Sequence, residues 1–190
     1  MMVKGLSMTE QTQSDLMLVQ AAQSGDRHAF NELVCRHRSG VVNVVYRMCG
    51  DAELAEEAAQ EAFLRAWQHL PSYNPRYAFR SWLYRIAVNA ALDVLRRVRP
   101  GLEEPDELPH PNVIQPEVAL ESAQRAEAVR KAVLALPPAC RAVVVLREYE
   151  GLSYQEISAA LGIPVGTVMS RLSYGRCQLR LALAACLEAL

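Results

Sequence analysis

Residues 153–180, SYQEISAALGIPVGTVMSRLSYGRCQLR, predict a helix, a tight turn and a second helix whose charged side chains are all arginines. Ser153 and Glu156 have the spacing of a capping box, which satisfies two backbone amides at a helix start. Gly162 suits the left-handed residue that ends the first helix, and Pro164 suits the first turn of the second. Because arginines and short polar side chains on one helix face can enter the major groove of DNA, this stretch favours a DNA-binding helix-turn-helix over a solvated hairpin.

The second of these helices separates an apolar stripe from a polar face. The stripe contains Val168 and Leu172, one turn apart, with Leu179 further along. We expect the exposed face to carry Thr167, Ser170, Arg171, Tyr174 and Arg176.

Composition places the chain among globular proteins. It has 190 residues, 51% of them apolar, which is enough for one large domain or two small ones. There is no long uncharged apolar run, and residues 1–15 lack the apolar core of a signal peptide, so we expect a cytoplasmic protein without membrane insertion. The five cysteines form no CxxC pair, which indicates neither a disulfide framework nor a metal site.

The net charge of −1 hides a strong alternation of charge along the chain. Residues 51–61 contain five acids and no base, whereas residues 76–99 contain six arginines against the single acid Asp93. Residues 98–117 are acidic again, and residues 164–180 are basic. Such alternation is expected of a protein that touches both DNA and a basic protein surface.

Apolar periodicity predicts an all-α chain with two helical blocks. In the first block we expect a short helix capped by Ser14 that ends near Gln23, and Gly-Asp pairs at 25–26 and 50–51 delimit a long second helix. Two more helices follow, at about 52–69 and about 79–97. No stretch shows the alternation of a strand.

The second block is predicted to begin after a proline-rich linker. Residues 98–117 hold five prolines and five acids, so we expect a flexible tether between domains at 1–97 and 118–190. A helix from about Glu117 to Leu136 and another opened by Pro137 and Pro138 precede the helix-turn-helix. We expect no fixed arrangement of the two domains in the free chain, because such a tether has little to pack.

The predicted helix at 52–69 carries a cluster of acids on its exposed side. Glu53, Glu56, Glu57 and Glu61 are three or four residues apart, where like charges repel. We expect these acids to lack i,i+4 partners and to face a basic partner surface, the alternative being a solvated face.

The loop before the fourth helix alternates aromatic and basic residues. Tyr73 and Tyr77 are interleaved with Arg76 and Arg80, and Trp82 follows on the helix. Rings can stack on unpaired bases while guanidinium groups hold phosphates. We expect the two tyrosines and two arginines to bind nucleic acid, and Trp82 to anchor the helix in the core.

The sequence gives no support to an enzyme. It has no glycine-rich phosphate loop, no GxSxG and no HExxH, and its four histidines are scattered. Carboxylate pairs occur only on the exposed helix and in the linker, where no pocket would shift their pKa. We therefore predict no catalytic residue, cofactor, metal or small-molecule substrate.

Five motifs, in order over about residues 25–180, carry a family resemblance: GDRHAFNELV, AEEAAQEAFLRAW, FRSWLYRIAVNAALDVLRR, LREYEGLSYQEIS and IPVGTVMSRL. The chain resembles the bacterial extracytoplasmic-function (group IV) sigma factors of the sigma-70 superfamily, of the envelope-stress sigma-E type. The resemblance implies a sigma-2 and a sigma-4 domain in an alternative sigma factor that starts promoter-specific transcription of a stress regulon. The implied partners are core RNA polymerase (its β′ clamp helices and β flap), promoter DNA and an anti-sigma factor, which can hold the chain at the inner membrane.

The resemblance also implies roles for individual residues. Docking on the β′ clamp helices is implied for Glu53, Glu56, Glu57, Gln60, Glu61, Phe63 and Arg65. Capture of the −10 element, including a flipped base, is implied for Tyr73, Asn74, Arg76, Tyr77, Arg80 and Asn89. At the −35 element, base edges are expected to contact Thr167, Ser170, Arg171 and Tyr174, and phosphates to contact Arg147, Tyr154 and Arg176.

Two positions depart from the family pattern, and two rival functions remain. Met169 and Tyr174 stand where related recognition helices often carry arginine, which implies fewer phosphate contacts and a flatter salt dependence at the −35 element. A helix-turn-helix regulator that acts without polymerase is the nearest rival, but it leaves the acidic helix and the aromatic loop unexplained. The second rival function is that of a helical adaptor that binds only protein.

Overall fold

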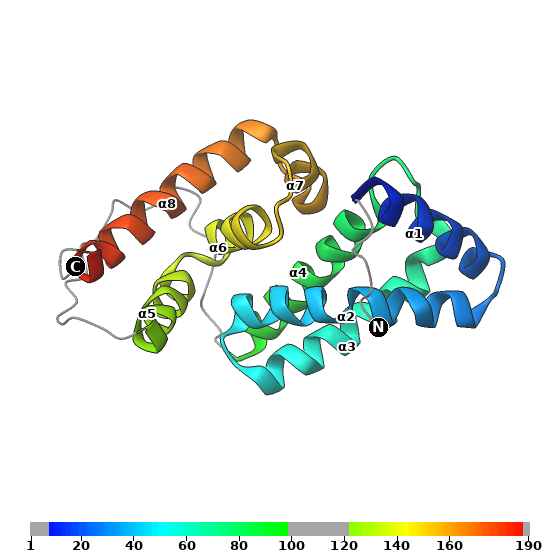
Figure 1. The fold of residues 1–190 in the computed structure, drawn as a ribbon, viewed down its shortest axis with the longest axis horizontal. Coiled ribbons are helices and arrows are strands. Elements are labelled where there is room, and N and C mark those ends of the chain that lie inside the picture. Colours follow the sequence, from blue (N-terminus) through cyan, green and yellow to red (C-terminus); the bar gives the residue numbers. More distant parts are fainter. Residues whose placement is uncertain (1–7, 99–121, 188–190) are drawn as a thin grey trace.

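The computed structural model describes residues 8–98 and 122–187, with side chains at 12–98 and 125–184 (Figure 1). Within these ranges every regular element is a helix or a helical turn, in agreement with the all-α prediction. We call residues 8–98 the N-terminal block and residues 122–187 the C-terminal block. The predicted linker at 98–117 lies outside the described residues except for Val98.

The N-terminal block consists of α1 (Met8–Gln23), α2 (Arg27–Cys49), α3 (Ala52–His69), the 3₁₀ turn η1 (Leu70–Ser72) and α4 (Phe79–Val98). Both predicted caps are confirmed, since Asp26 accepts hydrogen bonds from the amides of His28 and Ala29, and Asp51 accepts one from Leu54. The core face of α3 is made of small residues, namely Ala55, Ala58, Ala59, Ala62 and Ala66. Their size lets α3 lie close against α2 and α4.

The predicted start of the first helix at Ser14 is wrong. The helix begins at Met8, so Ser14 lies inside it. The hydroxyl of Ser14 accepts a hydrogen bond of 2.7 Å from Arg36 of α2 and therefore helps to hold two helices together.

The C-terminal block consists of α5 (Ser122–Ala135), α6 (Pro138–Val144), the π-helical turn η2 (Val145–Tyr149), α7 (Tyr154–Leu161) and α8 (Val165–Leu187). The capping box of Ser153 and Glu156 is present, and Gly162 ends α7 in the left-handed conformation with φ 66°. The predicted helix-turn-helix is therefore confirmed. Of the helix predicted from Glu117, residues 117–121 lie outside the described part of the chain.

The two blocks contact each other directly, which differs from the expected absence of a fixed arrangement (Figure 1). Arg130 of α5 donates to the carbonyl of Gly50 at 3.3 Å, and Arg141 of α6 donates to the carbonyl of Met48. A Cβ on Gly50 would lie 2.6 Å from Leu134 of α5, so the glycine allows this close approach. The expectation considered only the tether, whereas the helices themselves provide the contact. We call this the closed arrangement.

Within the described residues, no helix is both long enough and apolar enough to cross a bilayer.

Alanine substitutions at two glycines of α8 should have opposite effects on stability. A Cβ on Gly175 would lie 2.6 Å from a methyl group of Val144, whereas a Cβ on Gly166 would meet nothing within 4 Å. Gly166→Ala should therefore stabilise the fold by up to about 1 kcal/mol through helix propensity. Gly175→Ala should destabilise it, because overpacking of about 1–3 kcal/mol exceeds that gain. Urea unfolding of both variants measures the difference; equal shifts would contradict the tight crossing of α6 and α8.

Candidate functional site

Three of the four acids on the outer side of α3 form ion pairs, and Glu53 is exposed. The prediction that none of them has an i,i+4 partner is therefore wrong for Glu61. Glu56 pairs with Arg38 at 2.8 Å, Glu57 with Arg97 at 3.0 Å, and Glu61 with Arg65 at 2.7 Å. Arg65 lies one turn after Glu61, and the fold brings the other two arginines alongside from α2 and α4. The Glu56 and Glu57 pairs are well exposed to water, so each contributes little to stability and can exchange for another partner. Glu61 is 48% exposed, but its partner Arg65 is 34% exposed and also pairs with Asp93 at 2.7 Å.

An apolar groove of about 450 Å³ runs between α2 and α3, beside these acids. Phe30 and Trp67 form its wall with ring centroids 4.8 Å apart, and the predicted site residues Gln60 and Phe63 also line it. Leu64 is 59% exposed at its edge. The residues predicted for docking did not include Leu64, although a leucine beside an acidic stripe was the available signal. An apolar groove with charged margins suits a helical protein partner.

Tyr73 does not lie where base stacking requires it, so that prediction is wrong for this structure. Its ring is 7% exposed and packs against Phe79 and Trp82 with centroids 5.8 and 5.1 Å away. Its hydroxyl donates to the carbonyl of Tyr77 at 2.7 Å. Burial, with a smaller effect from the charge of Asp15, raises the pKa of Tyr73 to about 12. Trp82 anchors α4 in this aromatic cluster, as predicted.

The other residues of the predicted −10 surface are accessible. Asn74, Arg76 and Asn89 are exposed, and Tyr77 is 45% exposed. Asn74 accepts a hydrogen bond of 3.2 Å from the amide of Arg76, which fixes the turn of the loop. Arg80 differs, because it is half-buried and faces the C-terminal block.

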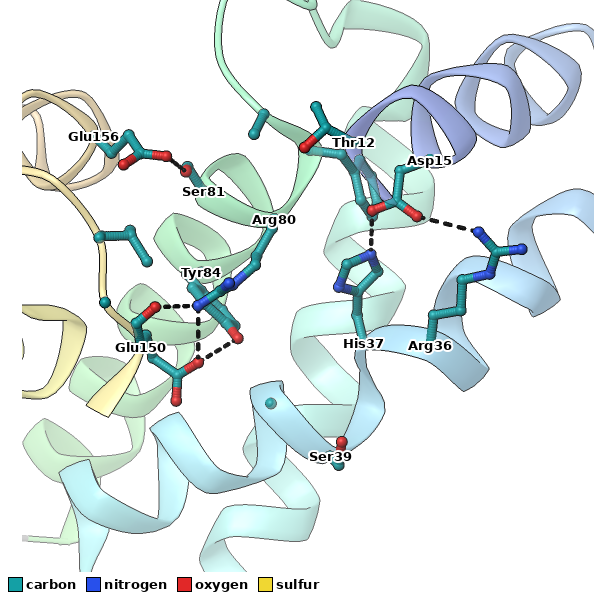
Figure 2. A pocket seen from close by; sticks show the side chains of 15 residues that line it. Thr12, Asp15, Arg36, His37, Ser39, Arg80, Ser81, Tyr84, Glu150 and Glu156 are labelled. Atoms are coloured by element: carbon teal, nitrogen blue, oxygen red, sulfur yellow. Dashed lines mark hydrogen bonds and ion pairs between the residues drawn. The ribbon is translucent and has the colours of Figure 1, made fainter. Parts of the chain in front are cut away.

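Figure 2 shows the pocket of about 340 Å³ that Arg80 lines, between α1, α2, α4 and the segment before α7. On its α1 side, Asp15 and His37 form a buried hydrogen bond of 2.7 Å. On its α7 side, the carboxylate of Glu150 accepts a hydrogen bond of 2.5 Å from the hydroxyl of Tyr84, and Arg80 donates to the carbonyl of Glu150. The Asp15–His37 bond lies within the N-terminal block, whereas the contacts of Glu150 with Tyr84 and Arg80 join the two blocks.

The outer face of α8 matches the prediction in part. Val168 and Leu172 are buried, Ser170 and Arg176 are exposed, and Thr167, Arg171 and Tyr174 are half-buried. Two apolar side chains that the prediction omitted from the DNA-facing set are also exposed, Met169 at 54% and Val165 at 38%. This helix packs on α5, α6 and α7, so its first turns remain accessible in the closed arrangement.

The arginines predicted to contact phosphates near α8 interact with neighbouring residues of the chain. The guanidinium of Arg147 lies over the ring of Tyr154 at 5.1 Å and donates to the carbonyl of Leu152 at 2.7 Å. Arg176 forms an ion pair of 2.6 Å with Glu148, and this hydrogen bond raises the pKa of Arg176 further. Both side chains keep part of their surface in water.

Among the described side chains, no three histidine, cysteine, aspartate or glutamate residues lie close enough to hold a metal ion. The geometry thus defines a helical protein with an amphipathic docking groove, an aromatic-basic loop and a helix-turn-helix. The first is suited to a protein, and the other two to nucleic acid.

Known proteins share this organisation over nearly the whole chain. Residues 33–100 match sigma-70 region 2, and residues 126–179 match sigma-70 region 4. The chain is 34% identical to the ECF RNA polymerase sigma factor SigW of Bacillus subtilis, over 85% of this chain and 92% of SigW. It is 37% identical to the ECF RNA polymerase sigma-E factor of Escherichia coli K12, over 89% of this chain and 93% of that protein.

The fold agrees with solved structures. CnrH, solved in complex with the cytosolic domain of CnrY, is 28% identical with a TM-score of 0.70, over 90% of this chain and 98% of CnrH. The sigma factor RpoE of Bartonella quintana shares the fold, with a TM-score of 0.63, 22% identity and coverage of 82% of this chain and 96% of RpoE.

The chain belongs to the ECF sigma factors of the sigma-70 family. It is an alternative sigma factor that directs promoter-specific transcription initiation, and it is not itself an enzyme. The rival function of a regulator that acts without polymerase is not favoured.

Substitutions at the two tyrosines of the loop should have different effects, one on DNA binding and the other on stability. Tyr77→Ala should leave the free energy of unfolding nearly unchanged but weaken binding of single-stranded DNA by about 1–3 kcal/mol, because its exposed ring is free to stack. Tyr73→Phe should instead cost about 1 kcal/mol of stability through the lost hydrogen bond and leave DNA binding intact. Urea unfolding and fluorescence anisotropy measure the two effects, and the reverse assignment would refute the placement of the rings.

Proposed function

We propose that the groove between α2 and α3 is the surface by which this sigma factor docks on the β′ clamp helices of core polymerase. The observation that carries the proposal is the exposed Leu64 beside an apolar wall, bordered by the ion pairs of Glu56 and Glu61. A basic partner helix can cover the apolar wall and take over the carboxylates. Burial of apolar surface supplies affinity, and the acids supply orientation and on-rate.

The division of the chain follows from this assignment. Residues 1–97 form the sigma-2 domain, residues 98–117 a linker, and residues 118–190 the sigma-4 domain, which also docks on the β flap. Asn74, Arg76, Tyr77, Arg80 and Asn89 serve the −10 element. The outer face of α8 enters the major groove at the −35 element, with Ser170 and Arg171 toward base edges and Arg176 toward a phosphate.

Control by an anti-sigma factor is part of the proposal. CnrH was solved with the cytosolic domain of CnrY, and RpoE of B. quintana with the anti-sigma factor NepR. By extension, a protein of this kind holds the present chain inactive in the cytoplasm or at the inner membrane until a stress signal releases it.

The docking surface predicts that Leu64→Asp weakens association with core polymerase. Leu64 would meet the apolar part of the basic partner helix, where a carboxylate loses its hydration, so affinity should fall at least about tenfold. Met17→Asp is the matched control, because Met17 is also a well-exposed apolar residue (69%) but lies on α1, away from the groove. Binding to core polymerase and initiation from a promoter library are measured together. Equal loss in both variants, or loss in neither, would contradict the docking surface.

The −35 surface predicts a change in salt dependence. If Arg176 contacts a phosphate, Arg176→Ala should lower the slope of log affinity against log salt by about 1 on promoter-length duplex DNA. Arg180→Ala is the matched control, since Arg180 is exposed on the same helix one turn further on and has no assigned contact. An unchanged slope for Arg176→Ala would remove Arg176 from the interface.

A further inference from the structure

The last two residues of η2 and the residue that follows them, Glu148-Tyr149-Glu150, form an acidic turn before α7. Gly151 follows with φ 69°, a left-handed conformation that reverses the chain direction. The amide of Leu152 then donates to the carbonyl of Leu146 at 3.0 Å, and Arg147 donates to the carbonyl of Leu152. These hydrogen bonds within the C-terminal block fix the turn, and Glu150 faces the N-terminal block.

Glu150 contacts the N-terminal block at Arg80 and Tyr84, both on α4 (Figure 2). Its carboxylate accepts 2.5 Å from the Tyr84 hydroxyl and lies 3.5 Å from the Arg80 guanidinium, which also donates to the Glu150 carbonyl. The side chain of Glu150 is only 11% exposed. Burial and the hydrogen bond to Glu150 raise the pKa of Tyr84 to about 12, so its hydroxyl remains a donor at neutral pH. A hydroxyl and a guanidinium directed at one anion are also the donors that bind a phosphate.

The contacts on either side of Glu150 hold the same two surfaces together. The ring of Tyr149 lies 4.2 Å from the guanidinium of Arg47 of α2. Glu156 of α7 accepts a hydrogen bond of 3.3 Å from Ser81 of α4. Burial opposes ionisation of Glu156, but hydrogen bonds from the side chain and amide of Ser153 and from Ser81 leave its pKa lowered, so it contacts α4 as an anion.

The closed arrangement cannot span a promoter. The −10 and −35 elements are centred roughly 25 base pairs apart, which is about 85 Å of duplex at ~3.4 Å per base pair. A compact chain of 190 residues has a radius of gyration near ~16 Å. Engagement of both elements therefore requires the blocks to separate, and separation withdraws Glu150 from Arg80.

We propose that the acidic turn is a built-in competitor of promoter DNA, in which Glu150 occupies Arg80 and Tyr84 until the blocks separate. This inference rests on the proposed function, because that function assigns Arg80 to the −10 surface. The carboxylate takes the place of a backbone phosphate, so promoter strand and turn exclude each other. The free chain consequently holds this part of its −10 surface shut, while α8 stays accessible.

The test compares free chains, without polymerase, for binding to a fluorescein-labelled 15-nucleotide single strand of mixed sequence. Glu150→Gln removes the negative charge but keeps the shape, and should raise affinity by about fivefold or more at low salt. Glu32→Gln on α2 is the matched control, because it makes the same charge change at an exposed acid outside the turn. X-ray scattering of the same samples should give a larger radius of gyration for Glu150→Gln alone.

Two further variants make the result decisive. In the Glu150→Gln background, Arg80→Ala should abolish the gain, and Tyr84→Phe in the wild-type background should give part of it. The proposal is overturned if Glu150→Gln binds no better than Glu32→Gln, or if its gain persists without Arg80. If Glu150→Gln fails to fold, as judged by circular dichroism, Tyr84→Phe carries the same comparison. Wild-type initiation with core polymerase is assayed in parallel, so the competitor can fail while the assigned sigma function stands.

Discussion

The contact between the two blocks depends on two charged side chains that are largely buried where the blocks meet. Arg141 of the C-terminal block is 5% exposed and reaches the carbonyl of Met48, and Glu150 reaches Tyr84 and Arg80. A buried charge without partners is strongly unfavourable, so these contacts specify how the blocks meet. When the blocks separate, water hydrates the same charged groups, and this hydration offsets the loss of their contacts. The closed arrangement is therefore specific in geometry, but its opening requires little free energy.

The two DNA surfaces differ in how this contact affects them. The first turns of α8 keep an accessible outer face, because α8 packs mainly on α5, α6 and α7 of its own block. Arg80 lies in the contact itself, whereas Tyr77 and Arg76 remain in water beside it. Under the proposed roles of these residues, the closed chain can recognise duplex DNA but cannot fully capture a melted strand. That order suits a protein that should engage single-stranded DNA only once the polymerase has separated its domains.

Sequence reasoning succeeded where local chemistry decides the structure. Asp26, Asp51 and Gly162 mark helix ends because a cap or a left-handed residue depends on a few neighbouring amides. The apolar stripes placed α3 and α4 within a residue of their observed bounds for the same reason. The family resemblance identified the two predicted blocks as sigma-2 and sigma-4 domains.

Sequence reasoning failed where contacts between residues far apart in the chain decide the structure. Tyr73 looked like an exposed stacking residue, but Phe79 and Trp82 enclose its ring. The partners of Glu56 and Glu57 come from α2 and α4, which no local pattern reveals, whereas the Glu61–Arg65 pair was visible one turn apart and was overlooked. The contact of Glu150 with Tyr84 joins residues 66 positions apart. Such pairings follow from the packing of whole helices.

The central claim is that this sigma factor is closed when free and opens on core polymerase. Neutron scattering of the deuterated chain, alone and bound to contrast-matched core polymerase, measures its own dimensions in both states. We predict a radius of gyration of roughly 16–20 Å for the free chain and about twice that value in the complex. The same radius of gyration in both states would contradict the account.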